Sequence, residues 1–160
     1  MTKLEKTTRV AADMQTLLRV LTDEETVVAR ELSRGALDAK VVAPVRDGSH
    51  YRYELHSTKY GRTMTGAEDK NKTQKQVSTY DWDMDAASCT FATDTGNGDR
   101  VKVEGYMKAK AVGDDSELTF GMSVDVRIPV VGKGIEKLVA REFNKAFPEF
   151  EEALRKGLPT

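Results

Sequence analysis

The chain has 160 residues, 25 of them basic and 26 acidic, so the formal net charge is −1. A nearly neutral chain carries no bulk charge that would favour nucleic acid or an anionic membrane as a partner. The length suits one domain, residues 1–160, with a sizeable core, and no apolar run approaches the ~20 residues of an integral membrane segment.

The N-terminal part predicts one strand followed by two short helices. Leu4 to Val10 suits a short edge strand, and Asp13 can cap the first helix. Thr22 begins the sequence Thr-Asp-Glu-Glu, a capping box with Glu25 at the third helical position, which opens the second helix. The apolar positions assigned to these helices are Met14, Leu17, Leu18, Leu21, Val27, Val28 and Leu32.

From Gly35 onward the apolar residues recur every second position, which predicts strands. The clearest pair covers Val101 to Ala111 and Leu118 to Ile128, where apolar and polar residues alternate. Such alternation indicates an antiparallel sheet with one buried and one wet face. Gly105 and Gly121 mark the positions where these long strands can bend or bulge.

One polar stretch, Tyr60 to Thr73, predicts a long mobile loop. Gly61 and Gly66 would be its pivots, and Met64 is among its few apolar anchors. A segment with so little apolar surface cannot offset its ordering entropy. We therefore expect a ligand to enter between this loop and the second helix, around Val27 to Leu32.

The C-terminal part predicts one long helix over residues 133–156. Pro129 ends the preceding strand, and Gly132 with Gly134 makes the turn into the helix. Pro148 removes a helical hydrogen bond, so the sequence predicts a kink near Asn144 to Pro148 or a break before a short final helix. The apolar stripe of this helix consists of Ile135, Leu138, Val139, Phe143, Ala146, Phe150, Ala153 and Leu154.

This order of elements resembles the START-like superfamily, the helix-grip fold of birch-pollen-type allergens, lipid-transfer domains and polyketide cyclases. The segment Val124-Asp-Val-Arg-Ile-Pro-Val-Val-Gly-Lys-Gly-Ile-Glu-Lys-Leu-Val resembles an uncharacterised bacterial branch of that superfamily. The resemblance implies an α+β helix-grip fold. A curved antiparallel sheet of about six to seven strands would wrap around the long C-terminal helix, with two short helices after the first strand. It also implies a hydrophobic-ligand cavity, and it brings no catalytic motif.

A set of large apolar residues supplies the candidate cavity lining. Large apolar side chains usually lie inside a protein, so a filled core is one interpretation. The other is a ligand pocket, because Tyr and Trp offer polar groups, Met adapts its shape, and small residues nearby leave volume. The candidate ligand-binding residues are Tyr51, Tyr53, Tyr80, Trp82, Phe91, Met107, Phe120, Met122, Val139, Phe143 and Phe147.

The remaining polar groups favour structural interpretations. His50 and His56 lie too far apart on one strand face to chelate a metal, and Cys89 is distant in sequence and cannot form an internal disulfide. Three aspartates between residues 81 and 85 suit a solvated strand face, and the glycines at 132 and 134 suit a turn. We therefore assign no catalytic residue, no metal site and no cofactor.

The leading hypothesis is a module that binds or carries a small hydrophobic molecule, lipid-like or aromatic, between the sheet and the C-terminal helix. One alternative is a cyclase- or dehydratase-type enzyme acting on a polyketide-like substrate. Another is an interaction protein whose core is filled. Charged residues through the first twenty positions exclude a signal-peptide core, so a cytoplasmic location is expected. The sequence leaves the oligomeric state open.

Overall fold

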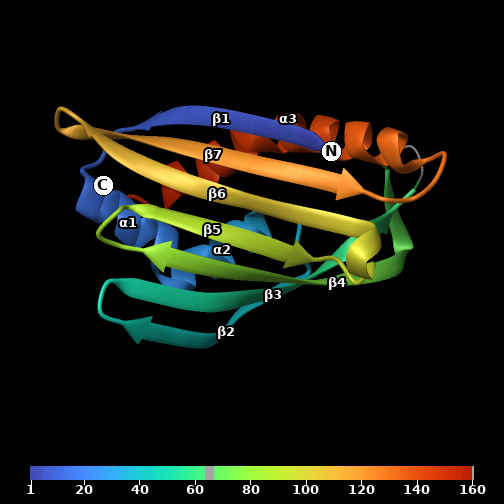
Figure 1. The fold of residues 1–160 in the computed structure, drawn as a ribbon. Coiled ribbons are helices and arrows are strands. Elements are labelled where there is room, and N and C mark those ends of the chain that lie inside the picture. Colours follow the sequence, from blue (N-terminus) through green and yellow to red (C-terminus); the bar gives the residue numbers. More distant parts are fainter. Residues whose placement is uncertain (64–66, 160) are drawn as a thin grey trace.

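The computed structural model describes residues 1–63 and 67–159. Over these residues, seven antiparallel strands form one sheet in the order β1-β7-β6-β5-β4-β3-β2, with three α-helices (Figure 1). The predicted α+β class is confirmed. The elements are β1 (Thr2–Val10), α1 (Met14–Thr22), α2 (Glu24–Ser33), β2 (Asp38–Asp47), β3 (His50–Arg62), β4 (Glu68–Asp83), β5 (Ser88–Asp94), the 3-10 turn η1 (Gly98–Arg100), β6 (Val101–Val112), β7 (Asp115–Val126) and α3 (Gly132–Lys156).

The helices cover one face of the curved sheet. In Figure 1 the sheet lies in front, with α1 and α2 behind it and α3 along the β1–β7 edge. Helix α3 contacts β1 and β7, and α2 contacts both β2 and α3. No described helix is long and apolar enough to cross a membrane.

The short helices begin at aspartate caps. The Asp13 carboxylate accepts the Thr16 backbone N–H at 2.8 Å, which confirms the first predicted cap. The capping box at Thr22 is wrong, because Thr22 ends α1 and its hydroxyl donates to a carbonyl four residues earlier at 2.6 Å. Asp23 caps α2 instead, since its side chain accepts from the Thr26 backbone N–H at 3.3 Å. A carboxylate at a helix N-terminus is also favoured by the helix dipole.

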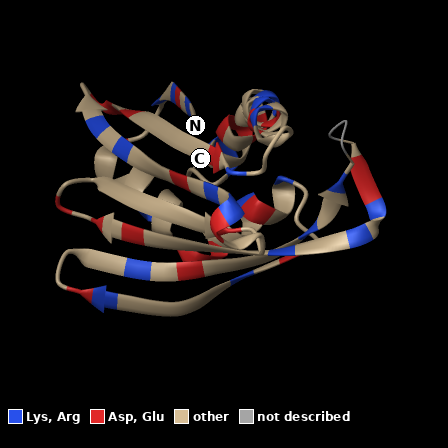
Figure 2. Ribbon diagram, turned by 45° about the vertical axis from the view of Figure 1, so that its right-hand side comes forward, with Lys and Arg blue, Asp and Glu red and all other residues tan. Residues whose placement is uncertain are grey.

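The mobile loop predicted for Tyr60 to Thr73 is wrong. Strand β3 continues to Arg62 and β4 begins at Glu68, so most of the stretch is a paired hairpin. The outer part of this hairpin carries charged residues (Figure 2), so the alternation that identifies a half-buried strand is missing there. The predicted pivot Gly66 and anchor Met64 lie outside the described residues.

Two glycines let an aromatic ring from a neighbouring strand pack directly on the sheet backbone. A Cβ at Gly105 would lie 2.3 Å from the Phe91 ring and 2.4 Å from the Gly121 carbonyl oxygen. On the other face, a Cβ at Gly121 would lie 2.3 Å from the Tyr106 ring. Each glycine therefore provides the flat site on which a neighbouring aromatic ring packs.

Helix α3 begins close to the end of β7. A Cβ at Gly132 would lie 2.5 Å from the Val126 carbonyl oxygen, so only glycine permits this approach. One turn later, the Glu136 carboxylate accepts the Thr2 hydroxyl at 2.8 Å and the Val126 backbone N–H at 3.2 Å. The helix then runs unbroken through Pro148 to Lys156, so the predicted break is absent.

Gly105→Ala should destabilise the fold, because the new methyl group meets both a ring and a backbone oxygen. The expected cost is about 1–3 kcal/mol, as for other overpacked sites. Gly134→Ala is the matched control, since a Cβ at this position of α3 would have nothing within 4 Å. Alanine there should be neutral or stabilising by up to about 1 kcal/mol. Urea unfolding of both variants measures the difference, and equal midpoints would contradict the close approach.

Glu136 should make stability depend on acidic pH. Its bonds from the Thr2 hydroxyl, the Val126 N–H and the Met1 amino group lower the pKa of its carboxyl from 4.5 to about 2. The unfolded chain therefore binds a proton first as pH falls, and the stabilisation present above pH 4.5 is lost toward pH 2. Glu136→Gln should lower the unfolding midpoint at pH 7, with the gap to wild type narrowing over that window.

The control for this titration is Glu152→Gln, because Glu152 is exposed on the same helix and forms an exposed ion pair with Arg155 at 3.1 Å. Its midpoint should follow that of the wild type at each pH. A Glu136→Gln midpoint that stays parallel to wild type from pH 7 to pH 2 would contradict the assignment.

Candidate functional site

The strand-borne candidate residues lie in two adjacent cross-strand rows. In one row, Tyr53, Tyr80, Phe91, Gly105 and Met122 stand opposite one another across five strands. The neighbouring row contains Tyr51, Trp82, Cys89, Met107 and Phe120. All eight predicted strand residues therefore face the same side of the sheet.

The aromatic members form a continuous series of ring contacts from the sheet to the helix. Successive ring centroids lie 5.0 to 5.9 Å apart. The series joins Tyr51, Tyr53, Tyr80, Phe91, Phe120, Phe143, Phe147 and Phe150. Phe150 was not among the candidate residues, although the predicted helical stripe already included it.

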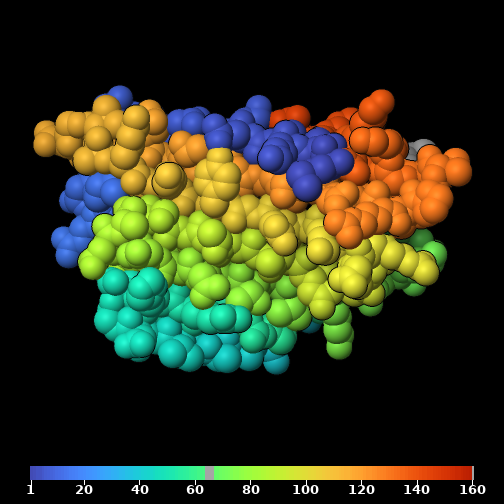
Figure 3. Space-filling model, viewed as in Figure 1, coloured from blue at the N-terminus to red at the C-terminus, as the bar shows by residue number. Residues whose placement is uncertain are grey.

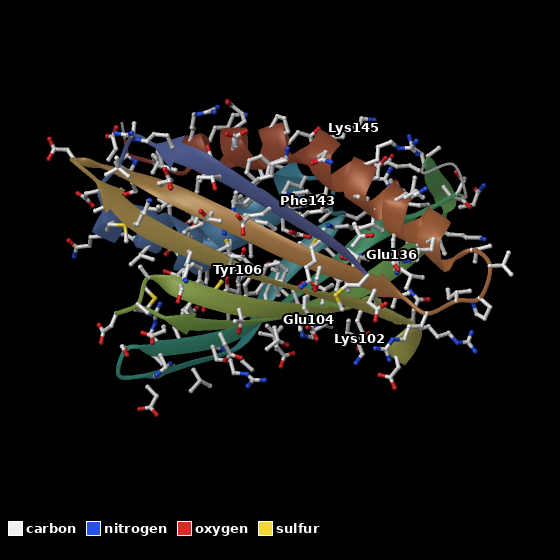
Figure 4. All side chains as sticks on the ribbon, turned by 45° about the horizontal axis from the view of Figure 1, so that its top comes forward. Lys102, Glu104, Tyr106, Glu136, Phe143 and Lys145 are labelled. Atoms are coloured by element: carbon white, nitrogen blue, oxygen red, sulfur yellow. The ribbon has the colours of Figure 1, made fainter. Side chains whose placement is uncertain are left out.

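Burial divides the candidate residues into two groups. Six are buried core residues, namely Tyr51, Tyr53, Trp82, Phe91, Met107 and Phe147. Five keep partial exposure, namely Tyr80, Phe120, Met122, Val139 and Phe143. The partly exposed group includes Val139 and Phe143, the two predicted residues in the N-terminal half of α3. Figure 4 labels Phe143 together with Glu136 of the same half. The inward surface is therefore least covered near this half of the helix.

The space between the rings is nearly filled in this conformation. A void of about 10 Å³ lies among Phe120, Phe143, Ala146, Phe147, Phe150 and Arg34. A water molecule needs about that much probe volume or more. A ligand larger than water can occupy this position only if side chains move.

Larger hollows lie on the opposite, outward face of the sheet. Three hollows of about 470, 420 and 500 Å³ follow the strands there, on the face seen in Figure 3. Two of them flank Tyr106, whose hydroxyl donates to Glu5 across the sheet. Their linings mix apolar residues with the charged side chains of Lys102, Glu104 and Lys108.

Helix α2 turns a charged face inward, which the apolar pattern did not indicate. Val27, Arg30, Glu31 and Arg34 follow the spacing i, i+3, i+4, i+7 of one helix face. Val27 and Glu31 are buried, whereas Leu32, a predicted stripe residue, is 44% exposed. The i, i+3, i+4, i+7 spacing of these residues is visible in the sequence. It was not used, because charged residues are rarely assigned to a buried helix face.

Each charge on this face has a distinct set of partners. Arg30 donates to the Val20 and Leu21 carbonyls at 2.8 and 3.2 Å, so it satisfies the end of α1. Glu31 pairs with Lys59 of β3 at 2.9 Å, and with Arg34 at 3.9 Å. The guanidinium of Arg34 lies 5.9 Å from the centre of the Phe150 ring.

These contacts set the charge states inside the site. Burial opposes ionisation of Glu31, but Lys59 and Arg34 hold the pKa of its carboxyl below the ordinary value. Desolvation of the hydroxyl raises the pKa of Tyr80 to about 12, although the residue as a whole keeps some exposure. Desolvation likewise raises the pKa of Tyr53. The site thus contains charged Glu31 and neutral tyrosines at neutral pH.

The other polar groups weighed from the sequence have local roles. His56 Nε2 lies 2.9 Å from Glu54, and His50 lines an outward hollow. Asp83 accepts the Ala86 backbone N–H at 3.1 Å in a turn, and Asp81 lies 3.9 Å from Arg52. No group of three metal-ligating side chains occurs among residues 1–63 and 67–159.

The family follows from comparison with known sequences. A family model described as a protein of unknown function (DUF2505) matches residues 5–156. The chain belongs to the DUF2505 family. A comparison with curated proteins found no match.

Solved structures show which fold the DUF2505 chain shares. TTHA0849 from Thermus thermophilus is 15% identical with a TM-score of 0.69, covering 98% of this chain and 96% of its own. The Zhui aromatase/cyclase from Streptomyces sp. R1128 is 12% identical with a TM-score of 0.64, and the match covers 97% of this chain and 92% of the cyclase. A START superfamily protein from Mycobacterium smegmatis is 19% identical with a TM-score of 0.51, covering 98% and 96%. The predicted START-like fold is confirmed.

In this DUF2505 chain, Phe143→Ala should cost less stability than Phe150→Ala. Phe150 is 6% exposed, so its removal should cost about 3–5 kcal/mol, as for a ring in a packed core. Phe143 is partly exposed, so less burial is lost and the cost should fall below that range. Urea unfolding measures both values. Equal costs would mean that Phe143 is as tightly packed as the core.

Proposed function

We propose that this protein binds or carries a small hydrophobic molecule between the inward face of the sheet and the N-terminal half of α3. The ligand's apolar body would lie against Tyr80, Phe91 and Met122 on one side and Val139 and Phe143 on the other. We propose that the eleven candidate residues predicted from the sequence form this region together, with Phe147 one turn beyond Phe143. Phe143 would move aside to admit the ligand.

One observation carries the proposal: the inward apolar surface is incompletely covered. Tyr80, Phe120, Met122, Val139 and Phe143 all keep partial exposure although they face the helix-covered side of the sheet. Apolar surface left in water is unfavourable by roughly 25 cal/mol per Å², so a ligand that covers it gains that energy. The likeness of the fold to a START superfamily protein and to an aromatase/cyclase supports the proposal of small-molecule binding at this surface.

An enzyme of the cyclase type is the second candidate, and the buried polar groups favour it. Glu31 could act as a base, and Tyr53 and Tyr80 could donate protons. Their raised pKa values make both tyrosines weak acids at neutral pH, however, and Glu31 is held in its ion pair with Lys59. Binding without chemistry therefore requires fewer assumptions about these residues.

The proposal predicts saturable binding of an uncharged hydrophobic probe, N-phenyl-1-naphthylamine, with enhanced fluorescence on direct excitation. Val139→Trp should place a ring in the volume proposed for the ligand, one turn before Phe143, and weaken probe binding by about 10-fold or more. A side chain that occupies the position of the ligand prevents the ligand from making its contacts there. Fluorescence titration measures both affinities.

The matched control is Val130→Trp, which adds the same ring at a position that is 101% exposed. Its probe affinity should equal that of the wild type. If the wild type binds no probe, and native mass spectrometry of protein from its own host detects no bound molecule, the binding proposal fails and the interaction-protein alternative is favoured.

A further inference from the structure

The inward face of α2 and the facing part of β3 carry more positive than negative charge. Arg30, Arg34 and Lys59 supply three cations, and Glu31 supplies the carboxylate that pairs with two of them. Burying charge without a partner is costly, so the buried parts of these cations need compensating groups. The pairing of these charges therefore indicates which of them is available to a ligand.

Two of the three cations are already satisfied. Arg30 donates to two carbonyl oxygens at the end of α1, at 2.8 and 3.2 Å. Lys59 holds Oε1 of Glu31 at 2.9 Å. Both cations lie within hydrogen-bond distance of their partners. They connect α2 to α1 and to β3, so they fix the position of the helix.

Arg34 differs from both. Within the described part of the chain, its closest ion pair is with Glu31 at 3.9 Å, beyond hydrogen-bond distance. Its side chain keeps 32% exposure and lines the small void with Phe120, Phe143 and Phe150. A planar guanidinium on an aromatic ring retains the N–H groups at its rim, which can still donate.

We propose that Arg34 binds the carboxylate of an amphipathic ligand whose apolar body occupies the site described above. This inference rests on the proposed function and narrows the ligand class to hydrophobic carboxylic acids. Arginine suits this task because its N–H groups match a carboxylate in a two-point contact. Together with Glu31, the ligand's carboxylate would bring the negative charges near these three cations to two.

The test compares dodecanoate with dodecan-1-ol, which share a chain length and differ in the head group. Binding is measured at neutral pH by displacement of N-phenyl-1-naphthylamine from wild type and from Arg34→Gln. The ratio of the two affinities should favour the acid in wild type and fall by about 10-fold or more in the variant. Dodecan-1-ol affinity should stay unchanged, which shows that the variant is folded with its site intact.

Two further variants sharpen the result. Arg155→Gln removes an exposed arginine of α3 and should leave the ratio at its wild-type value. Arg34→Lys keeps the charge but loses the two-point contact, so its ratio should fall between those of wild type and Arg34→Gln. It also serves as the folded comparison if Arg34→Gln is unstable.

The outcomes separate the two proposals. If wild type binds acid and alcohol equally, or if both Arg34 variants keep the wild-type ratio, the role of Arg34 is overturned while the proposed function stands. If wild type binds neither molecule and no probe, the proposed function fails, and the role of Arg34 fails with it.

Discussion

Two hydrogen bonds hold the long helix against the edge strand, and the site depends on that position. Glu136 accepts from the Thr2 hydroxyl and Glu151 from the Thr8 hydroxyl, at 2.8 and 2.6 Å. The six residue steps from Thr2 to Thr8 span ~20 Å of strand, and the fifteen steps from Glu136 to Glu151 span ~22 Å of helix. Because these lengths match, α3 can follow β1 without distortion. Its aromatic residues then face the β7 end of the inward rows, where Phe143 and Phe150 contact the Phe120 ring.

The same arrangement explains why the polar groups of the site come from α2. Helix α3 lies along the β1–β7 edge, so the ring series must reach across β5 and β4 to β3. Helix α2 contacts α3 as well as β2, and Arg34 at its C-terminal end lies over Phe150 of α3. An apolar face on α2 would extend the core to that point. The charged face instead leaves an apolar site with a polar end, which is the geometry an amphipathic ligand requires.

Sequence periodicity predicted the sheet and the long helix because alternating and helical patterns reflect which face is buried. Both long strands, β6 and β7, and the inward direction of Tyr51 and Tyr53 followed from it. The β3–β4 hairpin could not be read in this way, since its outer part has no buried face and therefore no alternation. The inward face of α2 was missed for the opposite reason: Glu31 is buried in an ion pair and the partly buried Arg30 donates to backbone carbonyls, which hydrophobicity does not register. Whether the rings fill the core was also beyond the pattern, because it depends on side-chain volume.

The small void limits how tightly a ligand can bind. Phe143 contacts the rings of Phe120 and Phe147 at 5.5 and 5.9 Å, and its displacement forfeits both contacts. At about 0.5–1.5 kcal/mol for each, opening costs ~1–3 kcal/mol. The open state is then about 5- to 150-fold less populated than the closed one, and the apparent affinity falls by that factor. A neutral apolar ligand must offset this cost by burial alone. A carboxylate held by Arg34 adds a charge-assisted contact of comparable energy, so the ionic contact offsets the opening of the aromatic layer.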